Sequence, residues 1–92
     1  MSIDMAQRPR RKSDYCLEVI DNELLLFHPA RTQILYCNET ASLIWQLCDG
    51  ERSSEDIVTL LVAAFPQTAE AIAADVVSTL QLFAQQGAIE WV

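Results

Sequence analysis

The side chains that most often carry chemistry are few in this sequence. It contains one histidine, His28, and three cysteines, Cys16, Cys37 and Cys48. None of the cysteines stands in a Cys-x-x-Cys pair, and a zinc site would need His28 as fourth ligand, at spacings unlike a zinc ribbon or finger. His28 precedes Pro29, which places it at a strand end or at the surface. We therefore predict no metal site and no histidine base.

Other catalytic motifs are also missing from the pattern. The two glycines, Gly50 and Gly87, lie 37 residues apart, too far for a glycine-rich phosphate loop. No serine or cysteine stands in a recognisable nucleophile turn. The carboxylates fall at expected helix caps and polar faces. These observations predict a protein that is not an enzyme and that uses no cofactor.

The cysteine count also bears on the compartment. Three cysteines cannot all pair within one chain, and the N-terminus shows no apolar signal segment. Free thiols, buried or half-buried, are the simplest interpretation. Free thiols are typical of a reducing environment, so we expect a cytoplasmic protein.

The charge is distributed unevenly along the chain. Six basic and thirteen acidic residues give a net charge of −7. Four of the basic residues, Arg8, Arg10, Arg11 and Lys12, stand in one run, and from Ser13 onward only two basic residues face twelve acidic ones. Such an acidic body repels phosphate backbones and favours neutral or basic partners. We expect no nucleic-acid partner.

Length and hydropathy predict one small domain. The chain has 92 residues, of which 51% are hydrophobic, enough for a folded core. Its uninterrupted apolar runs are much shorter than the ~18 residues of a transmembrane helix, so we expect no membrane partner. Residues 1–14 show no apolar periodicity and are predicted to be a flexible basic arm. The domain is predicted to span residues 15–92.

The domain is predicted to have an α+β fold of the winged helix-turn-helix type. Short runs rich in strand formers and joined by turn residues predict an antiparallel three-stranded meander, at 15–20, 24–28 and 33–37. Segments with apolar residues at helical spacing predict three helices, at 38–50, 53–65 and 68–86. Residues 88–92 alternate in part and predict a short closing strand.

Capping residues support these helix boundaries. Asn38 is expected to cap the first helix, and Ser53 with Asp56 resembles a capping box for the second. Gly50 is expected to end the first helix in a left-handed conformation. Thr68 is the expected cap of the third.

A winged-helix outline suggests DNA binding, but the charges disagree. The third predicted helix, which would enter the major groove, contains no Lys or Arg over 68–86. A DNA-binding helix needs basic side chains to neutralise phosphates. A winged-helix transcription factor therefore stays an alternative, as does a bridging module that binds only a protein surface.

Surplus apolar surface indicates a peptide-binding site instead. The apolar arc of the third helix is wider than one contact stripe needs. If the strand Gln33–Cys37 lies at a sheet edge, its free N–H and C=O groups can pair with a guest strand, whose side chains then fill the space beside the helix. The same arc is also what a core helix shows, and spacing alone favours the core. An open edge also leaves a homodimer possible.

The ordered set of residues in the helical half resembles the PqqD family over about 15–92. The matching segments are Asn38-Glu39-Thr40-Ala41, Ile44-Trp45, Leu47-Cys48-Asp49-Gly50, Arg52-Ser53, Asp56-Ile57-Val58, Leu61, Phe65-Pro66, Asp75-Val76, Leu80 and Gly87-Ala88-Ile89. The family consists of small winged-helix domains, the RiPP recognition elements. Its members are not enzymes.

The resemblance implies a leader-peptide chaperone. Such a protein binds the leader of a ribosomally made precursor peptide and presents it to a modifying enzyme, a radical SAM protein in pyrroloquinoline quinone biosynthesis. It also implies that the leader adds as a strand to the third strand of the meander and lies against the third helix. The implied contact residues are Thr32, Gln33, Ile34, Leu35, Tyr36, Cys37, Asp75, Val76, Thr79, Leu80 and Phe83.

Overall fold

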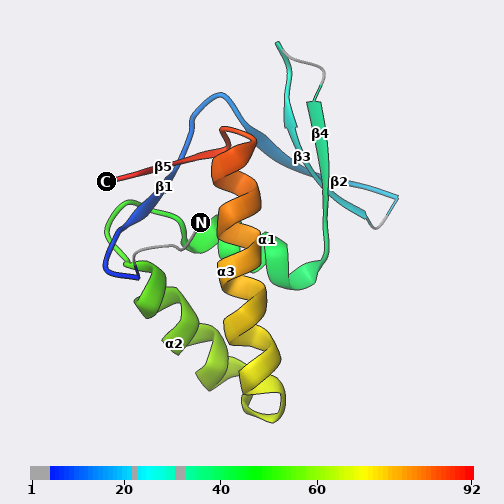
Figure 1. The fold of residues 1–92 in the computed structure, drawn as a ribbon. Coiled ribbons are helices and arrows are strands. Elements are labelled where there is room, and N and C mark those ends of the chain that lie inside the picture. The colour runs from blue at the N-terminus through cyan, green and yellow to red at the C-terminus, as the bar shows by residue number, and fades with distance from the viewer. Residues whose placement is uncertain (1–4, 22, 31–32) are drawn as a thin grey trace.

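The fold consists of a small antiparallel sheet, three helices and a two-stranded ribbon (Figure 1). The computed structural model describes residues 5–21, 23–30 and 33–92. The elements are, in chain order, β1 (Pro9–Arg11), β2 (Cys16–Ile20), β3 (Glu23–His28), β4 (Gln33–Cys37), α1 (Glu39–Leu47), α2 (Ser54–Ala64), the 3₁₀ helix η1 (Pro66–Thr68), α3 (Ala69–Gln85) and β5 (Ile89–Trp91).

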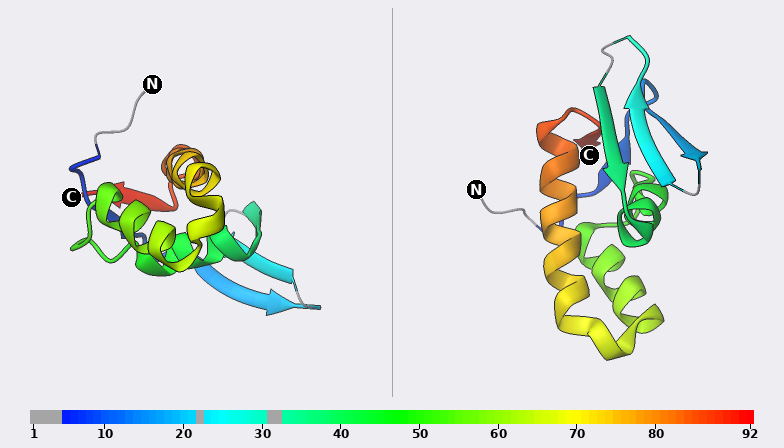
Figure 2. Two further views of the ribbon diagram at one scale, coloured as in Figure 1. Left: turned by 90° about the horizontal axis from the view of Figure 1, so that it is seen from below. Right: turned by 90° about the vertical axis from the view of Figure 1, so that its right-hand side faces the viewer.

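The predicted α+β architecture is confirmed. β2, β3 and β4 form an antiparallel sheet in that order, and the helices lie together on one side of it (Figure 2). Leu26, at the centre of β3, pairs with Leu17 on β2 and Leu35 on β4. Leu26 is fully buried against the helices. Because side chains alternate along a strand, this register fixes which residues of each strand face the core.

The N-terminal segment differs from the prediction of a flexible arm over residues 1–14. Pro9–Arg11 forms β1, which pairs antiparallel with β5, and the Val92 N–H donates to the Arg8 carbonyl at 2.8 Å. Pro9 is fully buried. The sequence did not predict this strand, because three residues that pair with the far end of the chain show no local hydrophobic periodicity.

Helix caps follow the predictions at two of three positions. The Asn38 side chain accepts from the Ala41 N–H at 2.8 Å, and Ser53 and Asp56 form a complete capping box. Thr68 does not cap α3, which is a correction. Its hydroxyl donates to the Phe65 carbonyl within η1, since Pro66 starts a tight turn before α3 begins. Gly50 is left-handed, at φ +80°, three residues beyond the end of α1.

An aromatic chain joins the sheet to the helices. Trp45 on α1 meets Phe83 on α3 edge-on, with ring centroids 5.6 Å apart. Trp45 also meets Tyr15, and the Tyr15 hydroxyl donates to the Gln86 carbonyl at 2.7 Å, just past α3. Aromatic pairs of this geometry add about 0.5–1.5 kcal/mol each beyond area burial. They position α3 relative to the start of β2.

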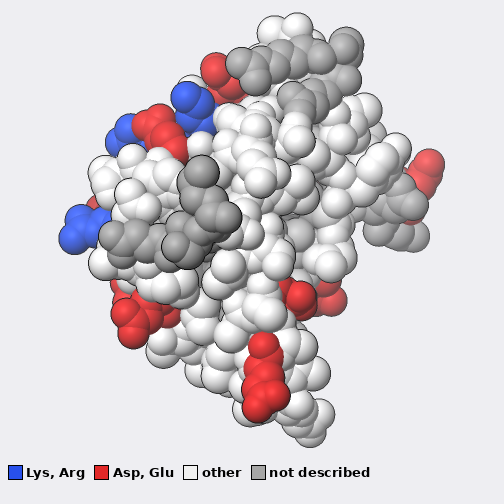
Figure 3. All heavy atoms as spheres, in the orientation of Figure 1, with Lys and Arg blue, Asp and Glu red and all other residues white. Residues whose placement is uncertain are grey.

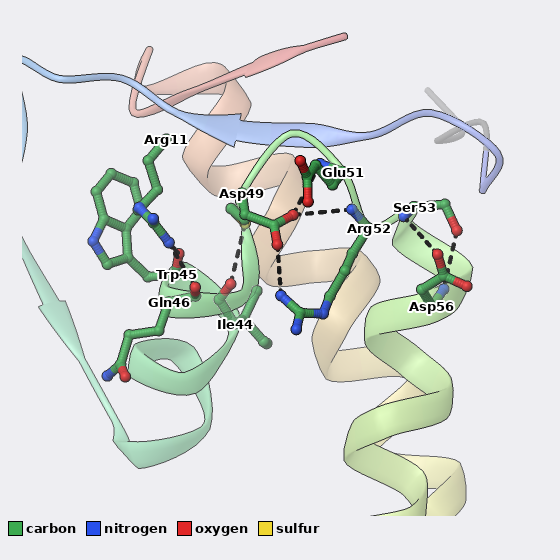
Figure 4. A network of polar contacts seen from close by, with 10 residues as sticks. Arg11, Ile44, Trp45, Gln46, Asp49, Glu51, Arg52, Ser53 and Asp56 are labelled. Carbon is green, nitrogen blue, oxygen red and sulfur yellow. Dashed lines mark hydrogen bonds and ion pairs between the residues drawn. The ribbon is translucent and has the colours of Figure 1, made fainter.

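Strand β1 also ties down the end of α1 (Figure 4). The last turn of α1 contains no basic residue, and its carbonyls need donors. The Arg11 guanidinium donates to the carbonyls of Trp45 at 3.2 Å and Gln46 at 2.6 Å, while the Arg11 N–H donates to the Cys48 carbonyl. A positive charge there also interacts favourably with the negative end of the helix dipole. Arg11, from the basic run, thus stabilises the fold.

The turn between α1 and α2 is built around one carboxylate (Figure 4). Asp49 accepts from the N–H groups of Glu51 and Arg52, each at 2.9 Å, and from the Arg52 guanidinium at 2.6 Å. The Arg52 N–H, the Glu51 N–H and the Arg52 charge lower the pKa of Asp49 below its usual range. The ionised form therefore holds this turn.

Removing the Arg11 side chain should weaken the fold measurably. We expect Arg11→Ala to reduce the free energy of unfolding by about 1 kcal/mol, because two helix-end carbonyls lose a charged donor. Urea unfolding followed by circular dichroism measures the loss. Arg8→Ala removes an exposed arginine beside the same strand and should cost less than about 0.5 kcal/mol. Equal losses would contradict the capping role.

The Asp49 turn should make stability depend on acid pH. A carboxyl whose folded pKa is lowered contributes stability above its unfolded pKa of about 3.9 and loses it as pH falls through the folded value. Wild type should therefore lose its advantage over Asp49→Asn between about pH 5 and pH 2. Thermal unfolding at several pH values tests this, with Glu51→Gln as control. A constant difference would refute it.

Candidate functional site

Two of the three cysteines, Cys37 and Cys48, are unsuited to nucleophilic chemistry. All three are unpaired. Burial raises the pKa of Cys48 to about 12, and its thiol donates to the Ile44 carbonyl at 3.1 Å. Burial also raises the pKa of Cys37. Cys16 is exposed on β2, which corrects the expectation that every thiol is at least half-buried.

His28 lies at the end of β3, as predicted, and is mostly buried. Its Nδ1 accepts from the Ala30 N–H at 3.2 Å, and its ring meets Tyr15 edge-on at 5.1 Å. Its Nε2 lies 3.9 Å from Asp14. Across residues 5–21, 23–30 and 33–92, no group of three His, Cys, Asp or Glu is arranged to hold a metal ion.

The most unusual feature of the surface is the free edge of β4. One edge of β4 pairs with β3 from Leu24↔Cys37 to His28↔Gln33, and no other described strand pairs with the opposite edge. Alternate residues of a strand direct N–H and C=O groups toward each edge, so part of the β4 backbone remains available to a further strand.

The side chains of β4 are uncharged and partly exposed. Leu35 is half-buried and Cys37 buried, on the face toward the core. Ile34 and Tyr36 point to the outer face and are 52% and 76% exposed. Exposed apolar side chains along an unpaired edge are typical of a surface that another chain covers.

The other free edge, on β2, is different. Glu18 stands in the middle of β2, and Asp14 and Asp21 flank the strand. Charges on an edge strand discourage pairing with another chain. Of the two edges, β4 is therefore the better acceptor of a guest strand.

Helix α3 runs beside β4 in the opposite direction (Figures 1 and 2). Its central stripe consists of Ile72, Val76, Leu80 and Phe83, all buried in the core. The alternative interpretation, that the apolar arc of this helix belongs to the core, is thus correct for the central stripe. Val76, Leu80 and Phe83, expected as peptide contacts, present no accessible side chain in this structure and instead support the site from beneath.

A second stripe of α3 remains accessible. Asp75, Thr79 and Leu82 follow at spacings of four and three residues, so they lie along one flank of the helix. Asp75 is exposed, Thr79 half-buried and Leu82 43% exposed. With the buried stripe facing the core and α2 on the other side of α3 (Figure 1), the right-handed winding places this flank toward β4.

We define the α3–β4 site as the free edge of β4 together with this flank. It unites seven of the expected contact residues, Gln33, Ile34, Leu35, Tyr36, Cys37, Asp75 and Thr79. Thr32 lies outside the described residues. Leu82 was missed, although its spacing from Asp75 and Thr79 predicts its place.

Charged side chains lie mainly around the rim of the surface that carries the site (Figure 3). Lys and Arg lie toward the left of this view, with carboxylates among them, and Arg10 and Lys12 pair with Glu90 of the β1–β5 ribbon. Further Asp and Glu lie at the right edge and around the lower part, and the middle, over α3 and β4, is largely uncharged. The α3–β4 site is therefore apolar along most of its length.

Within the described part of the chain, no single helix is both long and apolar enough to cross a membrane. α2 and the segment Pro66–Gln85 pass that test only as a pair, bent by 116°.

The fold is shared with a solved structure. A meander, three helices and a closing strand define a winged helix-turn-helix-like domain. TbiB1, solved in complex with the TbiA(beta) leader peptide, superposes with a TM-score of 0.70 at 21% identity, over 88% of this chain and 94% of that one.

Sequence comparison then defines the family. The family model for coenzyme PQQ synthesis protein D (PqqD) matches residues 23–89. A PqqA binding protein of Bradyrhizobium diazoefficiens is 32% identical over 87 residues, which are 95% of this chain and 84% of that protein. The chain belongs to the PqqD family, which confirms the resemblance noted in the sequence.

The same type of substitution should have a large effect on stability in the buried stripe of α3 and a small effect on its accessible flank. Leu80→Asp places a charge in the core and should lower the melting temperature by about 15 °C or more, since an unpaired buried charge costs several kcal/mol. Leu82→Asp, two residues along, should leave it within about 4 °C. Thermal unfolding by circular dichroism compares them. A Leu80→Asp variant whose melting temperature falls no further than that of Leu82→Asp would disprove the assignment of the stripes.

Proposed function

We propose that this chain is a non-catalytic accessory protein that binds a leader peptide by strand addition to β4. The observation that carries the proposal is the unpaired, uncharged edge of β4 beside the open flank of α3. The named binding partner of the Bradyrhizobium relative and the leader peptide bound to TbiB1 support it. The ligand would be the leader of a ribosomally made precursor.

Strand addition suits this geometry for two physical reasons. A guest strand gains main-chain hydrogen bonds to β4, which give affinity without requiring a particular sequence. Its side chains alternate, so one set meets Leu35, Thr79 and Leu82 while the other lies beside Ile34 and Tyr36. We therefore expect both sets of guest side chains to be apolar or aromatic along the middle of the guest strand.

Chemistry on the bound peptide belongs in this proposal to a separate modifying enzyme. The Cys37 and Cys48 thiols are buried with raised pKa values, and His28 is packed against Tyr15. A radical SAM protein of pyrroloquinoline quinone or another peptide-modifying pathway is the partner that family membership favours. Three unpaired cysteines favour a reducing compartment, the cytoplasm.

The charge distribution disfavours DNA binding, and two other uses of the site are distinguished by experiment. α3 contains no Lys or Arg, so a DNA groove would meet Asp75 and Glu70 without compensating cations. A homodimer formed by pairing two β4 edges would occupy the same site and compete with the guest. Capture of a large protein without any peptide would favour a bridging module.

Single prolines along β4 should separate strand addition from other modes of binding. Ile34→Pro, Leu35→Pro and Tyr36→Pro each remove one N–H, which points alternately toward β3 and toward the free edge. Variants that remove a free-edge N–H should stay folded and recover at least about 10-fold less precursor peptide from a lysate of the native host, measured by mass spectrometry.

The matched controls are Glu18→Pro and Val19→Pro, on the other free edge. Whichever of these stays folded by circular dichroism should recover the peptide like wild type. Undiminished recovery by every folded β4 variant would exclude strand addition. Recovery of no short peptide by wild type would argue against leader binding itself.

A further inference from the structure

Two exposed carboxylates lie at the end of the α3–β4 site where β4 finishes. Glu39 begins α1, two residues beyond Cys37, and Asp75 lies on the α3 flank in the half of the helix that neighbours this end. Neither forms an ion pair with another described residue. Both charges are therefore available to a bound chain.

At the opposite end of the site, the described carboxylate is Asp14, which lies 3.9 Å from Nε2 of His28. Between the two ends, the β4 residues and the flank residues Thr79 and Leu82 are uncharged. Among the described residues, the carboxylates without an ion-pair partner therefore lie at the end beside Glu39 and Asp75, while the carboxylate at the other end faces His28.

The direction of a guest strand follows from the sheet. Both strand pairs in this sheet are antiparallel, and antiparallel pairing is slightly more stable per residue than parallel pairing. A guest that continues the pattern runs opposite to β4. Its N-terminal side then lies where β4 ends, next to Glu39 and Asp75.

We infer that the guest of the α3–β4 site is a peptide with Lys or Arg immediately N-terminal to an apolar, strand-forming segment of about five residues. This inference rests on the proposed function and specifies its ligand. The body of the protein strengthens it: from Ser13 onward the chain holds two basic and twelve acidic residues, a charge of 2 − 12 = −10. That field attracts a cationic peptide before contact.

A displayed library of random 15-residue peptides tests the inference without knowledge of the natural ligand. Selection on the wild-type protein should enrich peptides in which Lys or Arg precedes an apolar segment. A synthetic copy of the dominant peptide should bind more tightly than an isomer with the same basic residues moved to the C-terminal side. Enriched peptides with no charge preference, or with basic residues after the apolar segment, would overturn the inference.

A double variant locates the effect at the two carboxylates. Glu39→Gln with Asp75→Asn should weaken binding of the dominant peptide roughly 3- to 10-fold at low salt, as expected for two exposed ion pairs. The difference should shrink at about 0.5 M salt. Glu51→Gln with Glu55→Gln changes the net charge equally at exposed positions outside the site and should retain nearly full affinity.

The failures of the two proposals are distinguishable. If peptides are enriched but the two double variants bind them equally well, the charge assignment fails while peptide binding stands. If no peptide is enriched, or if enriched peptides bind the folded β4 proline variants as tightly as wild type, the α3–β4 site itself is refuted, and the inference with it.

Discussion

A β-strand has hydrogen-bonding groups along two edges, and within the described part of the chain β4 is paired along only one of them. β3 occupies the first edge, and α3, which lies along the second, has no backbone groups to offer because its own are used within the helix. The backbone groups on this second edge of β4 therefore remain available to another chain. The exposed side chains of Ile34, Tyr36 and Leu82 lie around this unpaired edge. A third chain that paired with β4 would cover them.

Helix α3 can border the site only because its other face is fully engaged. Ile72, Val76, Leu80 and Phe83 hold it against the remaining helices and the aromatic chain through Trp45. A rigid helix beside an open strand limits the entropy lost when a guest binds, since the receptor is already ordered. In the proposed mode of binding, the core thus contributes to recognition although its side chains would not touch the peptide.

Local patterns were sufficient to predict most of the fold. The meander, the three helices and the caps at Asn38 and Ser53 all depend on residues within a few positions of one another. Features set by distant partners were not predictable in this way. β1 exists because residues 9–11 meet residues 89–91, and no spacing within the basic run announces that pairing.

The site shows the same division. The strand Gln33–Cys37 was placed correctly, because its length and composition are local properties. The buried stripe of α3 and its accessible flank are both compatible with one apolar arc, and only packing against α2 and α1 decides which side chains are covered. That is why Val76, Leu80 and Phe83 were expected at the surface of the site and Leu82 was not.

The pairing of β1 with β5 has a consequence for how the protein is made. β5 begins 80 residues after β1, so at 5–20 residues per second β1 waits roughly 4 to 16 s before it can pair. An unpaired strand during translation invites association with other nascent chains. Arg8, Arg10, Arg11 and Lys12 give this segment a positive charge during that interval, and like charges disfavour its pairing with the same segment of another nascent chain. Arg11, which later binds the end of α1, is one of these residues.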